Sequence, residues 1–203
     1  MRNLYQAELL THPNIPKPLH GVNPRTLLGQ EWWERKRQEA YATYDFHCWA
    51  CGIHKSHAKY HRWLEAHESY DIDYARGRVE LRDIVALCHS CHNFIHSGRM
   101  WELYKQKQLT KEKMLNILQH GFHVLKQNNL KPFYGTACLW LILQGYSPQH
   151  ANEIVKKKGF VPSYPHIAKW DEWHLILEGK RYYSRFEDME EWKIYYKSRA
   201  HIS

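Results

Sequence analysis

The sequence predicts an α+β fold in which a central module of two strands and one helix lies between two flanking regions. Two Cys-x-x-Cys pairs, at 48–51 and 88–91, enclose the strands. A helix-forming stretch follows the second pair, and most of the later chain also has helical spacing of apolar residues. We place the boundaries at an N-terminal arm and helix (1–45), the central module (46–107) and a mainly helical, basic and aromatic C-terminal region (108–203).

The N-terminal region is expected to be an arm followed by a helix. Residues 11–21 contain three prolines, which disfavour both a helix and a central strand. Residues 30–44 suit a helix that places three apolar side chains on one face, namely Trp33, Ala40 and Tyr44. That helix would lead the chain to the first cysteine pair.

The central module is expected to contain two strands joined by a loop. Residues 63–68 alternate in polarity as a strand does, and residues 79–87 form a second strand that leads into Cys88. Residues 71–77 supply the loop. Helix is predicted for 91–107, so His92 and His96, four residues apart, would project from the same helix face.

The C-terminal region begins with a helix after a predicted N-cap at Thr110, and a break follows at 128–132. Residues 136–143 are a buried helix or strand. A further helix is expected from Ser147-Pro148 to Lys158, ended by Gly159. This pair of segments is compatible with a DNA-reading helix-turn-helix, but an ordinary helical hairpin is the commoner structure and is favoured.

Aromatic and basic residues alternate in the chain after Phe160, as in Trp170, Trp173, Tyr182, Lys180 and Arg181. Such a mixture either stacks on unpaired bases or builds a small core with solvated lysines around it. The sequence leaves both alternatives open.

The chain of 203 residues carries a formal net charge of +8, and its pI is about 9.2. This charge favours polyanions, with nucleic acid ahead of membranes and acidic proteins. Residues 1–25 lack the apolar core of a signal peptide, and no stretch approaches about 20 apolar residues. A cytoplasmic protein without membrane contact is therefore expected.

The four paired cysteines are best explained as ligands of a structural zinc ion. Zinc in such sites takes four thiolates in tetrahedral geometry, and cytosolic thiols rarely form disulfides. The expected ligands are Cys48, Cys51, Cys88 and Cys91. Cys138 lies in an apolar run and is expected to be a small buried side chain.

The segments Leu64-Glu65-Ala66-His67-Glu68 and Cys88-x-x-Cys91-His92-Asn93-x-x-His96, with the first cysteine pair, resemble the HNH, or ββα-metal, endonucleases. The resemblance covers residues 46–100. It implies a zinc-stapled ββα-metal core in which a strand hairpin and one helix hold a single divalent ion.

Carried over residue by residue, the resemblance makes His67 a metal ligand from the strand, with His92 and His96 as ligands from the helix. The ion would be Mg²⁺ or another divalent cation. Glu68 stands where the family has the histidine that deprotonates the attacking water, and Asp83 where it has an asparagine. The resemblance thus implies catalytic roles for Glu68, His67 and His92.

Glu68 is a weak base unless burial or a nearby carboxylate such as Glu65 raises its pKa. Alternatively, Glu68 binds the metal and another histidine is the base; the candidates are His57, His61 and His89.

The predicted function is a metal-dependent endonuclease that hydrolyses nucleic acid, with DNA favoured over RNA. Four arginines near the motif are expected to bind phosphates, namely Arg76, Arg78, Arg82 and Arg99. One alternative is an HNH-derived zinc module without catalysis that binds nucleic acid or a protein partner. Another is a structural zinc protein with an unrelated enzyme in its C-terminal half.

Overall fold

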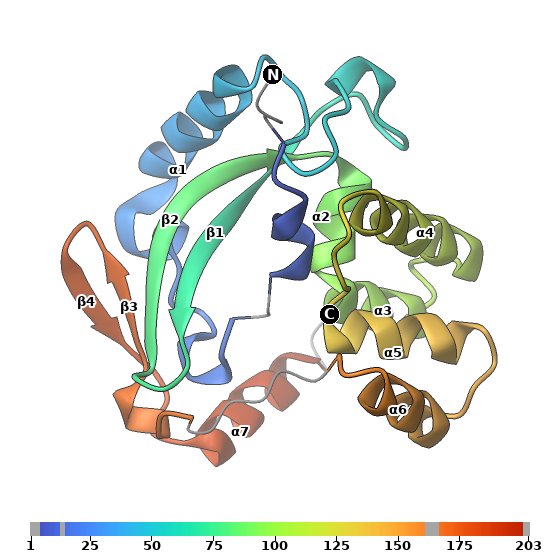
Figure 1. The fold of residues 1–203 in the computed structure, drawn as a ribbon. Helices are drawn as coiled ribbons and strands as arrows, with labels where there is room; N and C mark the ends of the chain where they lie inside the picture. Colours follow the sequence, from blue (N-terminus) through green and yellow to red (C-terminus); the bar gives the residue numbers. More distant parts are fainter. Residues whose placement is uncertain (1–4, 13–14, 161–166, 201–203) are drawn as a thin grey trace. The chain divides into compact units, whose positions relative to one another are not determined.

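The computed structural model describes residues 5–12, 15–160 and 167–200. Within them the chain forms seven α-helices and one four-stranded sheet, so the predicted mixture of helices and strands is confirmed (Figure 1). Residues 13–14 of the predicted N-terminal arm lie outside this description. None of the helices in the described ranges combines the length and apolar character of a membrane span.

The described residues form two compact units that interleave along the chain. The first comprises 5–12, 39–67 and 85–160, and the second comprises the three segments 15–38, 68–84 and 167–200. Each unit has a hydrophobic core of its own. All cysteines and histidines proposed above as metal ligands belong to the first unit. The boundaries predicted near residues 45 and 107 stay predictions.

Two consecutive strands of the sheet match the predicted hairpin. β1 is Glu65–Asp73 and β2 is Arg78–Leu87, so the expected strand before Cys88 is confirmed. β1 continues to Asp73, into residues for which a loop was expected, and the turn is confined to 74–77. Gly77 has a φ of +62° in this turn, and a Cβ there would lie 2.9 Å from the Ala168 side chain, so glycine fits best.

Within the described residues, the C-terminal region contains four helices and also supplies two strands that the sequence did not predict. β3, His174–Leu177, pairs in parallel with β2, and β4, Lys180–Tyr183, pairs antiparallel with β3. Glu178 and Gly179 both have positive φ, as a two-residue hairpin turn requires. Each strand has four residues, too few for a clear alternating pattern in the sequence. Pairing of β3 with β2, and of β4 with β3, stabilises what the local sequence does not specify.

The helix predicted over 91–107 is two helices. α2 is His89–Ile95 and α3 is Ser97–Lys105. They meet at His96, whose backbone departs from helical values with a φ of −85° and a ψ of 39°. The His96 amide still donates to the carbonyl of His92, at 3.1 Å. The four-residue relationship between these two histidines therefore survives the break.

The later helices of the first unit begin at their predicted caps. α4, Lys111–Gln127, starts after Thr110, whose hydroxyl accepts from the Lys113 amide. α5 is Tyr134–Leu143, which settles the helix-or-strand alternative. α6, Pro148–Lys157, starts after Ser147, whose hydroxyl accepts from the His150 amide. α5 packs against α6, and α4 packs against α2.

The remaining elements are the helices α1 and α7 and four short 3₁₀ turns. α1, Pro24–Thr43, includes the predicted helix but begins earlier and is interrupted at Gly29, whose φ is +87°. α7 is Met189–Ala200. Trp173 is buried in the second core, which favours the core alternative for this aromatic residue. The 3₁₀ turns are η1 (Ala7–Thr11), η2 (Lys17–Leu19), η3 (Lys55–His57) and η4 (Trp170–Glu172).

Gly121→Ala in α4 is expected to destabilise the first unit. A Cβ at this position would lie 2.1 Å from the ring of Phe94, which is fully buried in α2. Overpacking of this kind costs about 1–3 kcal/mol, more than the roughly 1 kcal/mol gained by replacing a helical glycine. Thermal unfolding followed by circular dichroism measures the loss. Gly98→Ala in α3 is the control and should not lower the melting temperature, because the new Cβ would have no atom within 4 Å apart from its chain neighbours and the backbone of its own helix.

Candidate metal centres

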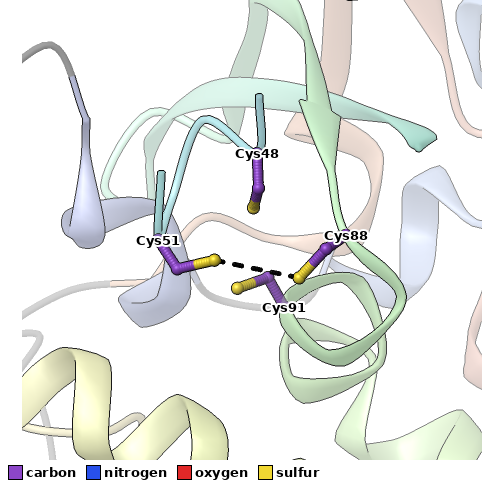
Figure 2. Close-up of side chains that lie close together, drawn as sticks. All are labelled: Cys48, Cys51, Cys88 and Cys91. Carbon is purple, nitrogen blue, oxygen red and sulfur yellow. Dashed lines mark hydrogen bonds between the residues drawn. The ribbon is translucent and has the colours of Figure 1, made fainter. Parts of the chain in front are cut away.

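Four cysteines form a cluster at metal-binding distance. The sulfurs of Cys48, Cys51, Cys88 and Cys91 all lie within 4.8 Å of one another. The separation of the Cys51 and Cys88 sulfurs is 3.9 Å, close to the roughly 3.8 Å between thiolates of a tetrahedral zinc site. Figure 2 shows the four sulfurs facing a common point. The predicted four-cysteine cluster is confirmed, and its geometry is consistent with structural zinc.

The first cysteine pair is held by backbone contacts. Gly52 donates to the carbonyl of Cys48 at 2.8 Å and closes the turn. Its φ of +75°, and the Tyr5 ring 2.6 Å from where a Cβ would be, favour glycine here. The Trp49 amide donates to the carbonyl of Ala86 at 2.8 Å. This last bond ties the turn to the end of β2, two residues before the second pair begins.

The electrostatics of the cluster also favour a cation. Hydrogen bonds from Cys48 and Cys51 lower the pKa of the Cys88 thiol below its usual range. Contacts with the neighbouring sulfurs, led by Cys48, raise the pKa of both Cys51 and Cys91. Thiolates this close repel one another, so the Cys88 thiolate forms readily whereas those of Cys51 and Cys91 do not. A divalent ion removes the repulsion and lets all four act as ligands.

His120 of α4 lies beside the cluster and carried no signal in the sequence. Its Nε2 is 3.3 Å from the Cys91 sulfur, within reach to donate an N–H to a thiolate. The same imidazole contributes to the low pKa of Cys88. Such donors to ligand atoms orient the ligand and stabilise its charge. His120 comes from a helix some thirty residues away along the chain, so only the packing of α4 on α2 reveals it.

His120→Ala is therefore expected to weaken metal binding by the four cysteines about ten- to hundredfold, the usual effect of losing such a donor. Competition with a chromogenic chelator for zinc measures the affinity. His123→Ala is a matched control, because this exposed histidine lies three residues further along the same helix. Equal zinc affinity in both variants would contradict the role given to His120.

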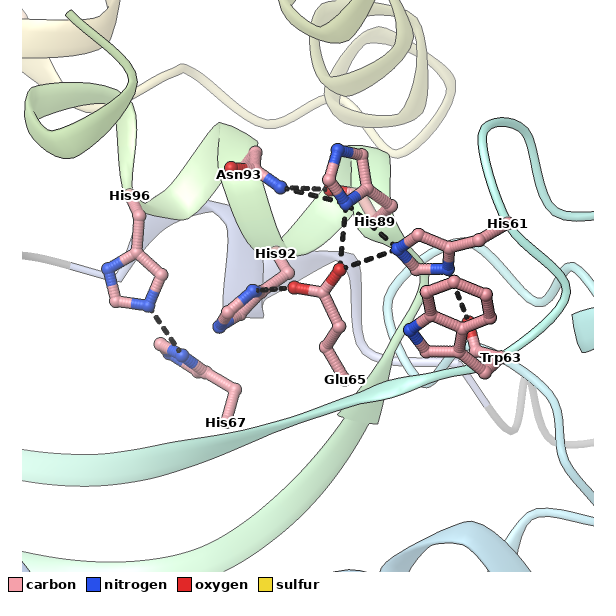
Figure 3. A network of polar contacts seen from close by, with 8 residues as sticks. All are labelled: His61, Trp63, Glu65, His67, His89, His92, Asn93 and His96. Carbon is pink, nitrogen blue, oxygen red and sulfur yellow. Dashed lines mark hydrogen bonds and ion pairs between the residues drawn. The ribbon is translucent and has the colours of Figure 1, made fainter. Parts of the chain in front are cut away.

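Three histidines form a second cluster. One nitrogen from each of His67, His92 and His96 lies within 4.8 Å of the other two. His67 comes from β1, His92 from α2, and His96 from the break between α2 and α3. His96 Nε2 is 3.1 Å from His67 Nδ1 (Figure 3). The structure thus brings together the three histidines that the sequence singled out.

The burial and the lowered pKa values of His67 and His96 suit metal ligands. His67 is only 6% exposed, and burial, with the nearby His96, His92 and His12, lowers its pKa well below the usual range. Burial, followed by the charges of His92 and Arg99, lowers the pKa of His96 to about 4. Both rings are therefore neutral at neutral pH, as metal coordination requires. Three imidazole nitrogens fit a transition ion better than Mg²⁺, which prefers oxygen ligands.

Glu65 orients one ligand of this cluster. Its Oε2 forms a short hydrogen bond with Nδ1 of His92, which leaves the other ring nitrogen to point toward His67 (Figure 3). Burial alone would raise the pKa of Glu65, but the contacts with His89 and His92 outweigh it and hold this pKa below the usual range. A carboxylate on the far nitrogen of a ligating histidine is a common feature of metal sites. From the sequence, Glu65 was expected only as a carboxylate that could raise the pKa of Glu68.

The residues that depart from the family pattern have different surroundings. Glu68 follows His67 in β1, and neighbouring residues of a strand point to opposite faces. Glu65, two residues before His67, shares its face instead. Strand geometry thus argues against Glu68 as the base beside His67. The other residues of the pattern have local partners: the Asp83 carboxylate accepts from the Ile84 amide at 2.8 Å, and Asn93 donates to the carbonyl of His89 at 2.9 Å.

The four arginines proposed for phosphate binding differ in their surroundings. Arg76 pairs with Asp73 at 3.0 Å, and Arg78 pairs with a neighbouring glutamate on β2. Arg82 is exposed on β2. Arg99 is exposed in α3, in the same unit as the histidines, and its charge lowers the pKa of His96. Of the four, Arg99 has the most direct evidence for a position near the histidine cluster.

Comparisons of the chain with protein-family models, with curated proteins and with solved structures gave no match.

Proposed function

We propose that this protein is a metal-dependent endonuclease of the HNH type, built on a zinc-stapled ββα-metal core. The observation that carries the proposal is the convergence of His67 from β1, His92 from α2 and His96 from the break between α2 and α3, beside a four-cysteine cluster. The structural ion would be zinc. The catalytic ion would be a divalent transition metal held by the three imidazoles.

The order of elements supports this proposal. The hairpin of β1 and β2 runs directly into Cys88, which caps α2, and α2 carries His92. The cysteines would therefore fix the start of α2 against the end of β2, where the backbone bond from Trp49 already ties the first pair. Fixing these two elements holds His92 at a set distance from His67 on β1.

Each residue of the proposed centre has a chemical role. His67, His92 and His96 would hold an ion that stabilises charge on a phosphate oxygen and makes bound water acidic. Glu65 keeps Nδ1 of His92 occupied, so that its other nitrogen is available as a ligand. Arg99 supplies positive charge next to the cluster for a phosphate.

The net charge of +8 supports a polyanionic substrate. DNA is proposed ahead of RNA because the family resemblance favours it. The alternative, a binding module without catalysis, is supported by the absence of a histidine at position 68, where Glu68 stands.

An assay of the purified protein decides between these functions. Plasmid DNA, single-stranded DNA and RNA would be incubated with Mg²⁺, Mn²⁺, Co²⁺ or Zn²⁺, and nicked or shortened products would be followed on gels. Cleavage that needs an added metal and stops with a chelator supports the endonuclease. Stable binding of nucleic acid without cleavage under any of these metals would establish the alternative.

Glu68→Gln is expected to retain most of the cleavage, because strand alternation turns this side chain away from the face that carries His67. Initial rates of plasmid nicking at saturating metal measure the effect. A fall of a hundredfold or more, with unchanged metal content, would instead restore Glu68 to the role of general base that the family resemblance implies.

A further inference from the structure

A third group of side chains lies next to the histidine cluster. His61, from the loop before β1, and His89, from the start of α2, both face Glu65 Oε1. The distances are 2.9 Å from His61 Nε2 to Glu65 Oε1, 2.7 Å from His89 Nδ1 to the same oxygen, and 3.0 Å between the two nitrogens. Figure 3 shows the three atoms forming a small triangle.

The hydrogen bond of His61 determines which of its nitrogens carries the proton. His61 Nδ1 lies 3.1 Å from the backbone oxygen of Trp63. A carbonyl oxygen only accepts, so Nδ1 donates, and a neutral His61 presents an unprotonated Nε2 to Glu65. Donation of the far N–H to a backbone carbonyl is the usual arrangement of metal-binding histidines.

The surroundings of His89 also favour an unprotonated ring nitrogen facing Glu65. The amide nitrogen of Asn93, which only donates, lies 3.3 Å from His89 Nδ1. This contact favours a lone pair on Nδ1. Together with the Glu65 carboxylate, three lone pairs then face one another at 2.7–3.0 Å. That arrangement needs a positive charge between the three atoms, which a proton on an imidazole supplies when no metal is bound and a divalent ion would supply otherwise.

The ring of His61 is also held in place before any ion binds. It stacks on the indole of Trp63, with ring centroids 3.8 Å apart and planes inclined by 3°. The side chains of His61, Glu65 and His89 are between 12% and 23% exposed. The group is thus rigid enough to be a site and open enough for an ion to enter.

From this geometry we infer that His61, Glu65 and His89 form a second divalent-cation site beside the histidine cluster. Two imidazole nitrogens and one carboxylate oxygen make a ligand set typical of Zn²⁺ and related transition ions, with positions left for water or a phosphate oxygen. The site is distinct from the four-cysteine cluster and shares no ligand with the histidine cluster.

The two neighbouring sites are linked through Glu65. Its Oε1 would bind the second ion, while its Oε2 bonds to His92 of the first cluster. The His92 ring and the Glu65 carboxylate stand between the two ligand sets (Figure 3). The second ion fixes the carboxylate that orients His92.

Counting bound ions tests this inference without any measurement of activity. The folded protein, still carrying the metal of its four cysteines, would be treated with a weak chelator and titrated with Zn²⁺. Native mass spectrometry and titration calorimetry then give the number of ions per chain. His61→Ala is expected to bind one ion fewer than wild type, and His96→Ala also one fewer. His123→Ala, an exposed histidine outside the three groups, is expected to match wild type.

The outcomes separate this inference from the proposed function. If His61→Ala binds as many ions as wild type, the three side chains share only a proton and the second site is overturned. If His61→Ala loses an ion while His96→Ala does not, the second site stands and the proposed catalytic centre fails. Circular dichroism of each variant checks the fold, since His61 lies in a loop and its removal should leave helices and strands intact.

Discussion

Replacement of His67 with alanine is expected to abolish metal-dependent cleavage while the zinc bound by the four cysteines is retained. His67 is the one ligand of the proposed catalytic ion that comes from β1, and it is buried between the strand and the two histidines of the helix pair. Without it, the remaining two imidazoles hold an ion too weakly to stabilise charge on a phosphate. A loss of about 4 kcal/mol in transition-state stabilisation corresponds to about a thousandfold in rate.

Nicking of supercoiled plasmid measures the rate, and elemental analysis measures zinc. His96→Ala is a second test of the same centre, because His96 is less buried and its loss costs less packing. His123→Ala in α4 is the control and should cleave as wild type does. Full cleavage by both His67→Ala and His96→Ala would remove the histidine cluster from the mechanism.

Replacement of Cys88 with serine is expected to unfold the first unit. Cys88 joins the end of β2 to the start of α2 and is one of four sulfurs at metal-binding distance. The apparent binding free energy of structural zinc is about 10–16 kcal/mol, whereas a whole domain is stable by about 5–15 kcal/mol. Loss of zinc binding would therefore remove an amount comparable to the total. Loss of helical circular dichroism and of bound zinc would be measured together.

Cys138→Ser is the matched control for this change. Cys138 lies in α5, outside the four-cysteine cluster, and is only partly buried. It should keep its zinc and its melting temperature within a few degrees of wild type. A Cys88→Ser protein with a normal content of helix and a cooperative unfolding transition would show that metal binding does not stabilise this unit.

Signals that depend on a few consecutive residues were predicted from the sequence. The two cysteine pairs, the caps at Thr110 and Ser147, and the four-residue spacing of His92 and His96 all reappear in the structure. Each is decided by local geometry: a tight turn, a hydroxyl beside a free amide, or one turn of helix. Such features can be predicted from the sequence without knowing which residues pack against them.

Features that depend on residues far apart in the sequence were not predicted, or were predicted with the wrong bounds. β3 and β4 are too short to have a clear pattern in the sequence. β3 pairs with the free edge of β2, and β4 pairs with β3. The helix predicted over 91–107 breaks at His96, whose backbone departs from helical values between two helical segments. These differences change the fold around the site but not the set of ligands.

The sequence by itself determined which residues form the cysteine cluster and which histidines accompany it, because these ligands come in short motifs. Only the tertiary structure decided that Glu65 contacts His92 and His89, and that His120 reaches Cys91. Those pairs are separated by 24 to 29 residues along the chain. His120 meets Cys91 because α4 packs on α2, and Glu65 reaches His89 and His92 of α2 from the start of β1. The packing of α4 on α2 depends on the whole hydrophobic core rather than on any local pattern.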